Sequence, residues 1–182
     1  MHPLIRLKET TPLFCITLAV LLFGLLPTAQ AVTPAPDGGY AHYTTAEGEN
    51  ALLNLTIGVV NTAVGALSLT SDTTGNYNVG VGGGALALNN GDSNTAVGTA
   101  ALFLNTTGTR NTATGTDTLV FNSTGNDNTA VGTFALEHNT ASGNTAVGSS
   151  AFVVDTIGSG NTIIGAAATI NNTTGNDNTG VG

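Results

Sequence analysis

The stretch Asn94–Arg110 reads NTAVGTAALFLNTTGTR, and close variants of it follow one another from Thr44 to the last residue. The units begin at residues 44, 61, 78, 94, 111, 128, 144, 161 and 178, so each spans 17 or 16 residues. Self-similarity at so short a period is typical of stacked, quasi-one-dimensional arrays. The repeat therefore decides the expected fold class before any other feature.

One unit follows the consensus N-T-A-V-G-x-x-A-L-x-x-N-T-T-G-x-x, with Gly fifth in every unit. Helix is disfavoured because Gly, Thr and Asn recur in every window. Gly and Asn also tolerate the backbone angles of tight turns. We expect two short strands per unit, one at T-A-V and one at A-L-x-x. The predicted fold class is all-β, a β-solenoid or β-roll of ~17-residue two-strand coils.

Stacking explains why residue identities recur. Equivalent positions of successive coils lie about 4.8 Å apart, so like side chains form ladders. The ninth position, Leu in most units, predicts a dry stripe. The leading Asn predicts an inward amide ladder that bonds along the axis.

The predicted core is thin. Residues of the Val64 and Leu69 type supply two sizeable apolar groups per unit, worth ~1.5–3 kcal/mol each when buried. Ordering a unit costs ~1–2 kcal/mol per residue. We therefore expect several chains to share one core in a homo-oligomer.

The 16-residue unit is always the third of a 50-residue triplet, and triplets begin at residues 44, 94 and 144. Duplication of a three-unit gene segment explains this rhythm. A three-sided arrangement with one triplet per circuit explains it as well, and both interpretations stay open.

Residues 1–31 are expected to form a secretory signal peptide. Arg6 and Lys8 precede an apolar run, Leu13–Leu26, and Ala29-Gln30-Ala31 is a small-x-small cleavage site. The alternative is an uncleaved membrane anchor, but the run is shorter than the ~20 residues of a spanning helix. We expect residues 32–43 to be a Pro/Gly linker. Residues 44–182 are expected to form the β-repeat array, with eight full units and a truncated ninth.

The chain is acidic, with a formal net charge of −8. Loss of Arg6, Lys8 and Glu9 with the leader leaves one cation, Arg110, and a net charge of −9. So few cations cannot neutralise phosphates, so nucleic acid is not an expected partner. We expect a chain exported by a bacterium, secreted or at the cell surface, with no membrane-spanning segment after cleavage.

Reactive groups form no recognisable constellation. His42 and His138 occupy unrelated positions of their units, and no nucleophile motif accompanies them. We therefore expect no enzyme and no cofactor, and we predict no catalytic, cofactor-binding or metal-ligating residue. A hydrolase would need a unique acidic cleft, which a repeated unit does not indicate.

Two ligand-binding alternatives stay open. Gly125–Asn128 and Gly175–Asn178 read GNDN, like calcium loops, although most units lack the acid. Thr follows the leading residue in all units but one, which would suit an ice-binding face. Its chain neighbours are Asn and Ala rather than a second Thr, and strand propensity alone also explains it.

The motifs Asn94–Gly98, Asn128–Gly132 and Asn144–Gly148, all NTAVG, resemble the head repeats of trimeric autotransporter adhesins (YadA-like). The resemblance covers residues 44–182 and extends to secreted bacterial NTAxGxxAL-repeat proteins. It implies a β-roll shared by three chains, so a trimer is favoured. It departs from the adhesin heads in its longer unit.

The leading functional hypothesis is an exported, non-enzymatic structural or adhesive repeat protein. It would present an elongated polyvalent surface to an extracellular surface or matrix ligand. The alternative is a solenoid that binds ice or calcium.

Overall fold

The computed structural model describes residues 41–153, 157–168 and 172–182. The chain divides into two units, Met1–Ala31 and Val32–Gly182, and only the second contains described residues. The predicted signal peptide and most of the predicted linker therefore lie outside the described residues. No helix in the described part of the chain is long and apolar enough to cross a membrane.

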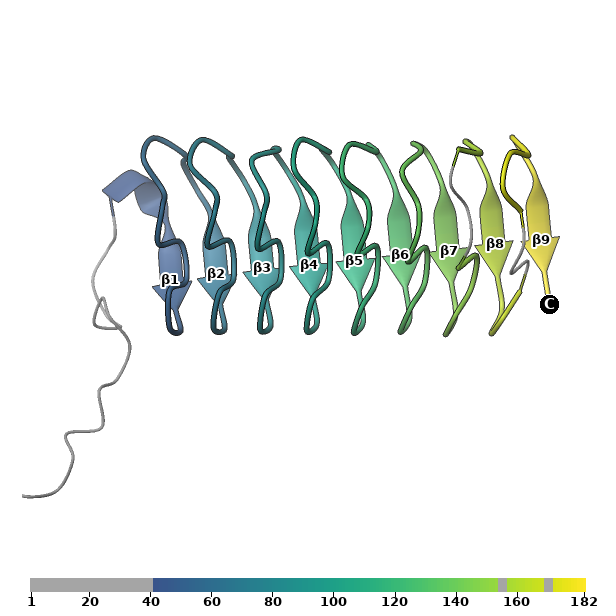
Figure 1. Ribbon diagram of the computed structural model, residues 1–182, viewed down its shortest axis with the longest axis horizontal. Helices are drawn as coiled ribbons and strands as arrows, with labels where there is room; N and C mark the ends of the chain where they lie inside the picture. Colours follow the sequence, from purple (N-terminus) through teal and green to yellow (C-terminus); the bar gives the residue numbers. More distant parts are fainter. Residues whose placement is uncertain (1–40, 154–156, 169–171) are drawn as a thin grey trace, which may run out of the picture. The chain divides into compact units, whose positions relative to one another are not determined.

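Nine parallel strands form one sheet in chain order (Figure 1). The strands are β1 (Thr45–Glu47), β2 (Thr62–Val64), β3 (Val79–Val81), β4 (Thr95–Val97), β5 (Thr112–Thr114), β6 (Thr129–Val131), β7 (Thr145–Val147), β8 (Thr162–Ile164) and β9 (Thr179–Val181). Equivalent residues pair throughout, as in Thr95 with Thr112 and Ala96 with Ala113. The structure confirms the all-β solenoid and the strand at T-A-V.

Pairing between coils begins before the predicted array. A short 3-10 segment, η1 (Ala41–Tyr43), precedes β1. The His42 carbonyl accepts the Val60 N–H at 2.8 Å. The end of the predicted linker is thus part of the first coil.

The prediction of a second strand at A-L-x-x is wrong for the described coils. Leu102 has a φ of 52°, and the same ninth position has a positive φ in every described coil where it is Leu or Phe. The Ala101 N–H donates to the Gly98 carbonyl, and the Asn105 N–H donates to the Leu102 carbonyl. These tight turns are too curved for a strand ladder, although single bonds such as Leu102 N–H to the Thr118 carbonyl, at 2.9 Å, still join the coils.

The core is a set of ladders inside the coil. The Leu stripe is confirmed, because the ninth-position side chains are fully buried in most coils: Leu69, Leu86, Leu102, Leu119, Leu136 and Phe152. Small residues at the third and eighth positions pack beside them. From the sequence we expected the fourth-position valines to fill the core. In the structure they face outward instead. Buried Asn takes their place.

This core is closed within one chain, since these side chains have no exposed surface in the absence of a partner. The thin apolar core that motivated the shared-core prediction is thus supplemented by polar ladders of the same chain. Sharing of a core between copies stays a prediction.

Candidate binding surface

A ladder of leading asparagines holds the coils at constant pitch. The Asn111 Oδ1 accepts the Asn128 N–H at 3.0 Å, and its Nδ2 donates to the Gly125 carbonyl at 2.8 Å. Coil after coil from Asn61 to Asn161 repeats this arrangement. The side-chain amide therefore acts as an extra peptide group in the parallel ladder.

A second buried ladder lies at the twelfth position. The Asn105 Nδ2 donates to the Asn89 Oδ1 at 2.6 Å and to the Gly108 carbonyl at 2.9 Å, and Asn122 continues the row. The amide-to-amide bonding expected for the leading Asn is confirmed in the leading row, where the Asn111 Nδ2 donates to the Asn94 Oδ1 at 3.1 Å; the twelfth-position row is a second one that the sequence did not predict. No buried side-chain nitrogen or oxygen of the described residues lacks a partner.

The outer side of the sheet carries two ordered rows of side chains. Strand residues alternate sides, so the second and fourth positions of a unit share the outer side while the third points inward. We call the outward residues of β2–β9 the sheet face. They are Thr62, Val64, Val79, Val81, Thr95, Val97, Thr112, Thr114, Thr129, Val131, Thr145, Val147, Thr162, Ile164, Thr179 and Val181. All are β-branched and none is charged.

The exposed fractions of four outward valines of the sheet face are nearly equal. Val64, Val97, Val131 and Val147 are exposed by 38%, 39%, 38% and 38%. This constancy holds over β2, β4, β6 and β7, whereas Ile164 on β8 and Val181 on β9 are more exposed, at 43% and 79%.

Sequence reasoning missed this face because it compared each Thr with its chain neighbours. The residue that shares the outer side of the strand with Thr95 is Val97, two residues further on, because only residues i and i+2 share a face. The signal was present: a small residue, Ala or Gly, stands between two β-branched residues in seven of the eight strands β2–β9.

A second uncharged feature, which we call the apolar strip, comprises Leu88, Phe103, Leu104, Val120 and Phe121. These residues occupy the tenth and eleventh positions of adjacent coils, joined by bonds such as Leu104 N–H to the Val120 carbonyl at 3.0 Å. Leu88 and Phe121 are among its exposed members.

His138 extends the strip. Its ring stacks on Phe121 with centroids 4.6 Å apart and an interplanar angle of 7°. His42 precedes β1 and His138 follows β6, so the structure does not bring the two histidines together.

The charged groups lie outside both features. Arg110 makes a two-bond ion pair with Asp127, at 2.6 and 2.8 Å. Hydrogen bonding from Arg110 lowers the pKa of the Asp127 carboxyl. The acid of the calcium-like stretch Gly125–Asn128 is therefore engaged by a cation. Within the described ranges, no three His, Cys, Asp or Glu residues gather as metal ligands would.

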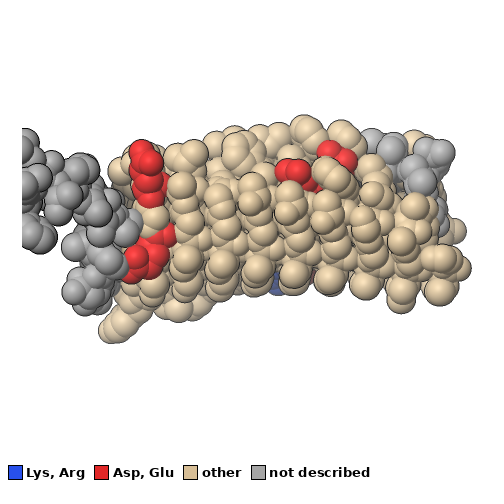
Figure 2. Space-filling model, turned by 90° about the horizontal axis from the view of Figure 1, so that it is seen from below, with Lys and Arg blue, Asp and Glu red and all other residues tan. Residues whose placement is uncertain are grey.

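Figure 2 shows the array from below. Acidic side chains appear at the β1 end and at one place midway along the array, and most of the remaining described surface in this view is uncharged.

One acid is buried. Asp72 occupies a twelfth position, where most other coils have Asn, and has no exposed surface. Burial raises the pKa of its carboxyl, against the opposing effect of the Gly75 N–H, which donates to Oδ1 at 2.7 Å. The Asn78 Nδ2 lies 3.3 Å from the other oxygen.

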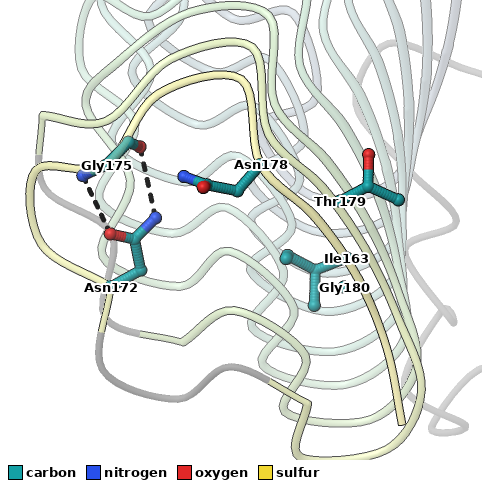
Figure 3. Close-up of a pocket in the computed structure, with 6 residues that line it drawn as sticks. All are labelled: Ile163, Asn172, Gly175, Asn178, Thr179 and Gly180. Carbon is teal, nitrogen blue, oxygen red and sulfur yellow. Dashed lines mark hydrogen bonds between the residues drawn. The ribbon is translucent and has the colours of Figure 1, made fainter.

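A depression of about 360 Å³ lies at the β9 end of the array (Figure 3). It is lined by Ile163, Asn172, Gly175, Asn178, Thr179 and Gly180. Asn172 is tied to Gly175 by two hydrogen bonds. Ile163 is buried beside Gly180 of β9, and Asn178 belongs to the last described coil, so this hollow is the interior of that coil and not a built ligand site.

Together, the fold and its exterior define a parallel β-solenoid repeat protein with two uncharged features on its outside, the sheet face and the apolar strip. No family model, curated protein or solved structure matches the chain. The resemblance to autotransporter heads therefore stays a prediction.

Proposed function

We propose that this chain is an exported, non-enzymatic structural or adhesive repeat protein of a bacterial exterior, which presents an elongated polyvalent surface. The observation that carries the proposal is the sheet face, where the same pair of outward positions recurs in register in eight successive strands. A weak contact made at one coil is thereby available at every other coil, and linked weak contacts add up to avidity.

The proposal includes a homo-oligomer, with a trimer favoured, in which the apolar strip forms the contact between copies. Exposed apolar side chains gathered in one place are typical of interaction surfaces. The strip differs from the sheet face in having aromatic rings, which bury large areas on contact. A contact through the strip would leave the sheet face free for an extracellular surface or matrix ligand.

The repeat offers a direct test of polyvalency. Deleting residues 94–143 removes one triplet, with three of the nine strands, and joins Ser93 to Asn144 in the same register. Because the deletion also removes most of the apolar strip, the shortened chain is compared with the full-length Phe121→Glu variant, which is expected to be monomeric. Adsorption to a collagen-coated sensor is measured after circular dichroism has shown that both are folded.

If each coil contributes ~0.5 kcal/mol, the loss of three coils weakens binding about tenfold. No binding by either chain, or equal affinity of the two, would contradict the proposal. Light scattering on the full chain tests the oligomer separately, with Phe121→Glu expected to dissociate it. A wild-type monomer would contradict this part.

A further inference from the structure

The sheet face is regular in two directions, and this regularity identifies its ligand class. We propose that the sheet face binds crystalline water, that is, the surface of an ice crystal. This inference rests on the polyvalent exterior proposed above and names the ligand of one of its surfaces.

The chemistry of the face fits a neutral lattice of water. The chain carries a net charge of −8, yet no charged side chain stands among the outward residues of β2–β9. A charged group would keep its own hydration shell and disturb the order of the adjacent water. Each Thr hydroxyl both donates and accepts a hydrogen bond, as a water molecule does. The Thr and Val methyl groups between the hydroxyls restrict the orientations of first-shell water.

The geometry fits a crystal better than it fits a protein. Equivalent residues repeat about every 4.8 Å along the stack, and the two rows lie about 6.6 Å apart along each strand. The shorter repeat is close to the oxygen repeat of hexagonal ice along its a axis. A protein partner has no such periodicity, whereas a crystal offers the same contact to every coil.

Stiffness maintains this repeat. β-Branched side chains have restricted χ1 rotamers, so the rows change little in shape. Below them, the buried Asn ladders fix the pitch, as with the Asn111 Oδ1 and the Asn128 N–H at 3.0 Å. Little conformational freedom remains to be lost when the face meets a rigid surface.

Two other occupants fit less well. Eight strands at ~4.8 Å and three residues at ~3.3 Å give a face of about 380 Å². A stable interface with a second copy needs about 800 Å² per partner, so a dimer through this face is too small. A sugar polymer would be held by aromatic rings, and the sheet face has none, since its residues are Thr, Val and Ile.

The test places one charge in the middle of the face. Thr112→Lys puts an ammonium group on β5, at an exposed position whose side chain makes no hydrogen bond that the substitution would break. Thr114→Lys does the same in the other row. The matched control is Thr107→Lys, an exposed turn residue with the same change in charge, away from the sheet face.

Thermal hysteresis and partition into a slowly grown ice hemisphere are measured for the exported chain and the three variants. Melting curves from circular dichroism confirm that each is folded. We expect hysteresis and incorporation into ice for the exported chain and for Thr107→Lys, and their loss in both sheet-face variants.

Absence of hysteresis and of ice incorporation in the exported chain would overturn the inference, and so would equal activity of all four proteins. Equal loss in Thr107→Lys would also overturn it, because the effect would then not belong to the face. The collagen assay is scored separately, so a chain that adsorbs to collagen but not to ice refutes only this inference.

Discussion

Replacing a single buried amide, Asn111→Ala, tests whether the leading Asn ladder holds the array together. The Asn111 Nδ2 donates to the Gly125 carbonyl at 2.8 Å and to the Asn94 Oδ1 at 3.1 Å. Its Oδ1 accepts from the Asn128 N–H at 3.0 Å and the Asn128 Nδ2 at 3.1 Å. All four hydrogen bonds are lost in the variant.

The groups that bond to Asn111 differ in the hydrogen bonds that they keep in the variant. The Gly125 carbonyl keeps the Asn122 Nδ2, and the Asn128 Nδ2 keeps the Ala141 carbonyl. The Asn128 N–H, inside a buried ladder, loses the acceptor that the structure gives it. An orphaned buried donor costs about 1–3 kcal/mol and each of the three other lost bonds about 0.5–1.5 kcal/mol, so we expect a loss of about 3–7 kcal/mol.

The matched control is Asn90→Ala. The Asn90 Oδ1 accepts from the Thr73 N–H at 2.9 Å and from its hydroxyl at 2.7 Å, but it is exposed, so water replaces these bonds. We expect a loss under about 1 kcal/mol. Urea unfolding followed by far-ultraviolet circular dichroism measures both variants. Equal destabilisation of the two would refute the view that the buried ladder supports the coils.

Three further substitutions test the packing and the buried acid. Gly80→Ala places a Cβ 2.5 Å from the Ser68 Oγ and should lower the free energy of unfolding by about 1–3 kcal/mol. Ser68→Ala should relieve this clash, so the effects of the two substitutions should not add in the double variant. Additive effects in urea unfolding would contradict the contact. Gly115→Ala, at a φ of 138° with a Cβ 2.7 Å from the Gly132 carbonyl carbon, should cost about 2–4 kcal/mol, and an unchanged urea midpoint would be the contrary result. Asp72→Asn should stabilise the chain at pH 7, because burial raises the pKa of the carboxyl above its ordinary 3.8 and the native state then carries a costly charge. As the pH falls through the raised pKa toward 3.8, the native state takes up the proton and the advantage of Asp72→Asn should shrink; an advantage independent of pH would contradict this.

The repeat predicted the array because stacking makes each position meet its own kind. Asn94 meets Asn111 and Leu102 meets Leu119 in neighbouring coils, so identity at a fixed period carries the parallel register without further information. The inward Asn and Leu ladders followed from the same argument.

The turn at Leu102 could not be foreseen, since a positive φ is unusual for Leu and its cost is offset only by burial in the assembled stack. Other left-handed positions did leave a trace. Gly84 and Gly143 stand where neighbouring coils have non-glycine residues with positive φ, such as Ala100 and Asp127. Substitution by Gly within a repeat therefore indicates which positions are turns.

The outward direction of Val97 was missed for a different reason. An apolar side chain in a short strand was assigned to the core, although Ala96 already filled the inner side. In a coil whose strand has three residues, only the middle one points inward, and its small size leaves the flanking pair for the surface.

Buried asparagine has a consequence that an apolar core would lack. An apolar ladder specifies register only through which side is buried, since a slip by one residue turns the other set of side chains inward. A slip of the Asn111 row by one residue would set its amide opposite Ser93 or Thr95 instead of Asn94 and leave backbone groups such as the Asn128 N–H without an acceptor. The amide ladders thus penalise every wrong register of the stack. The same penalty keeps Thr aligned with Thr on the outside, and a surface that works through its periodicity depends on that alignment.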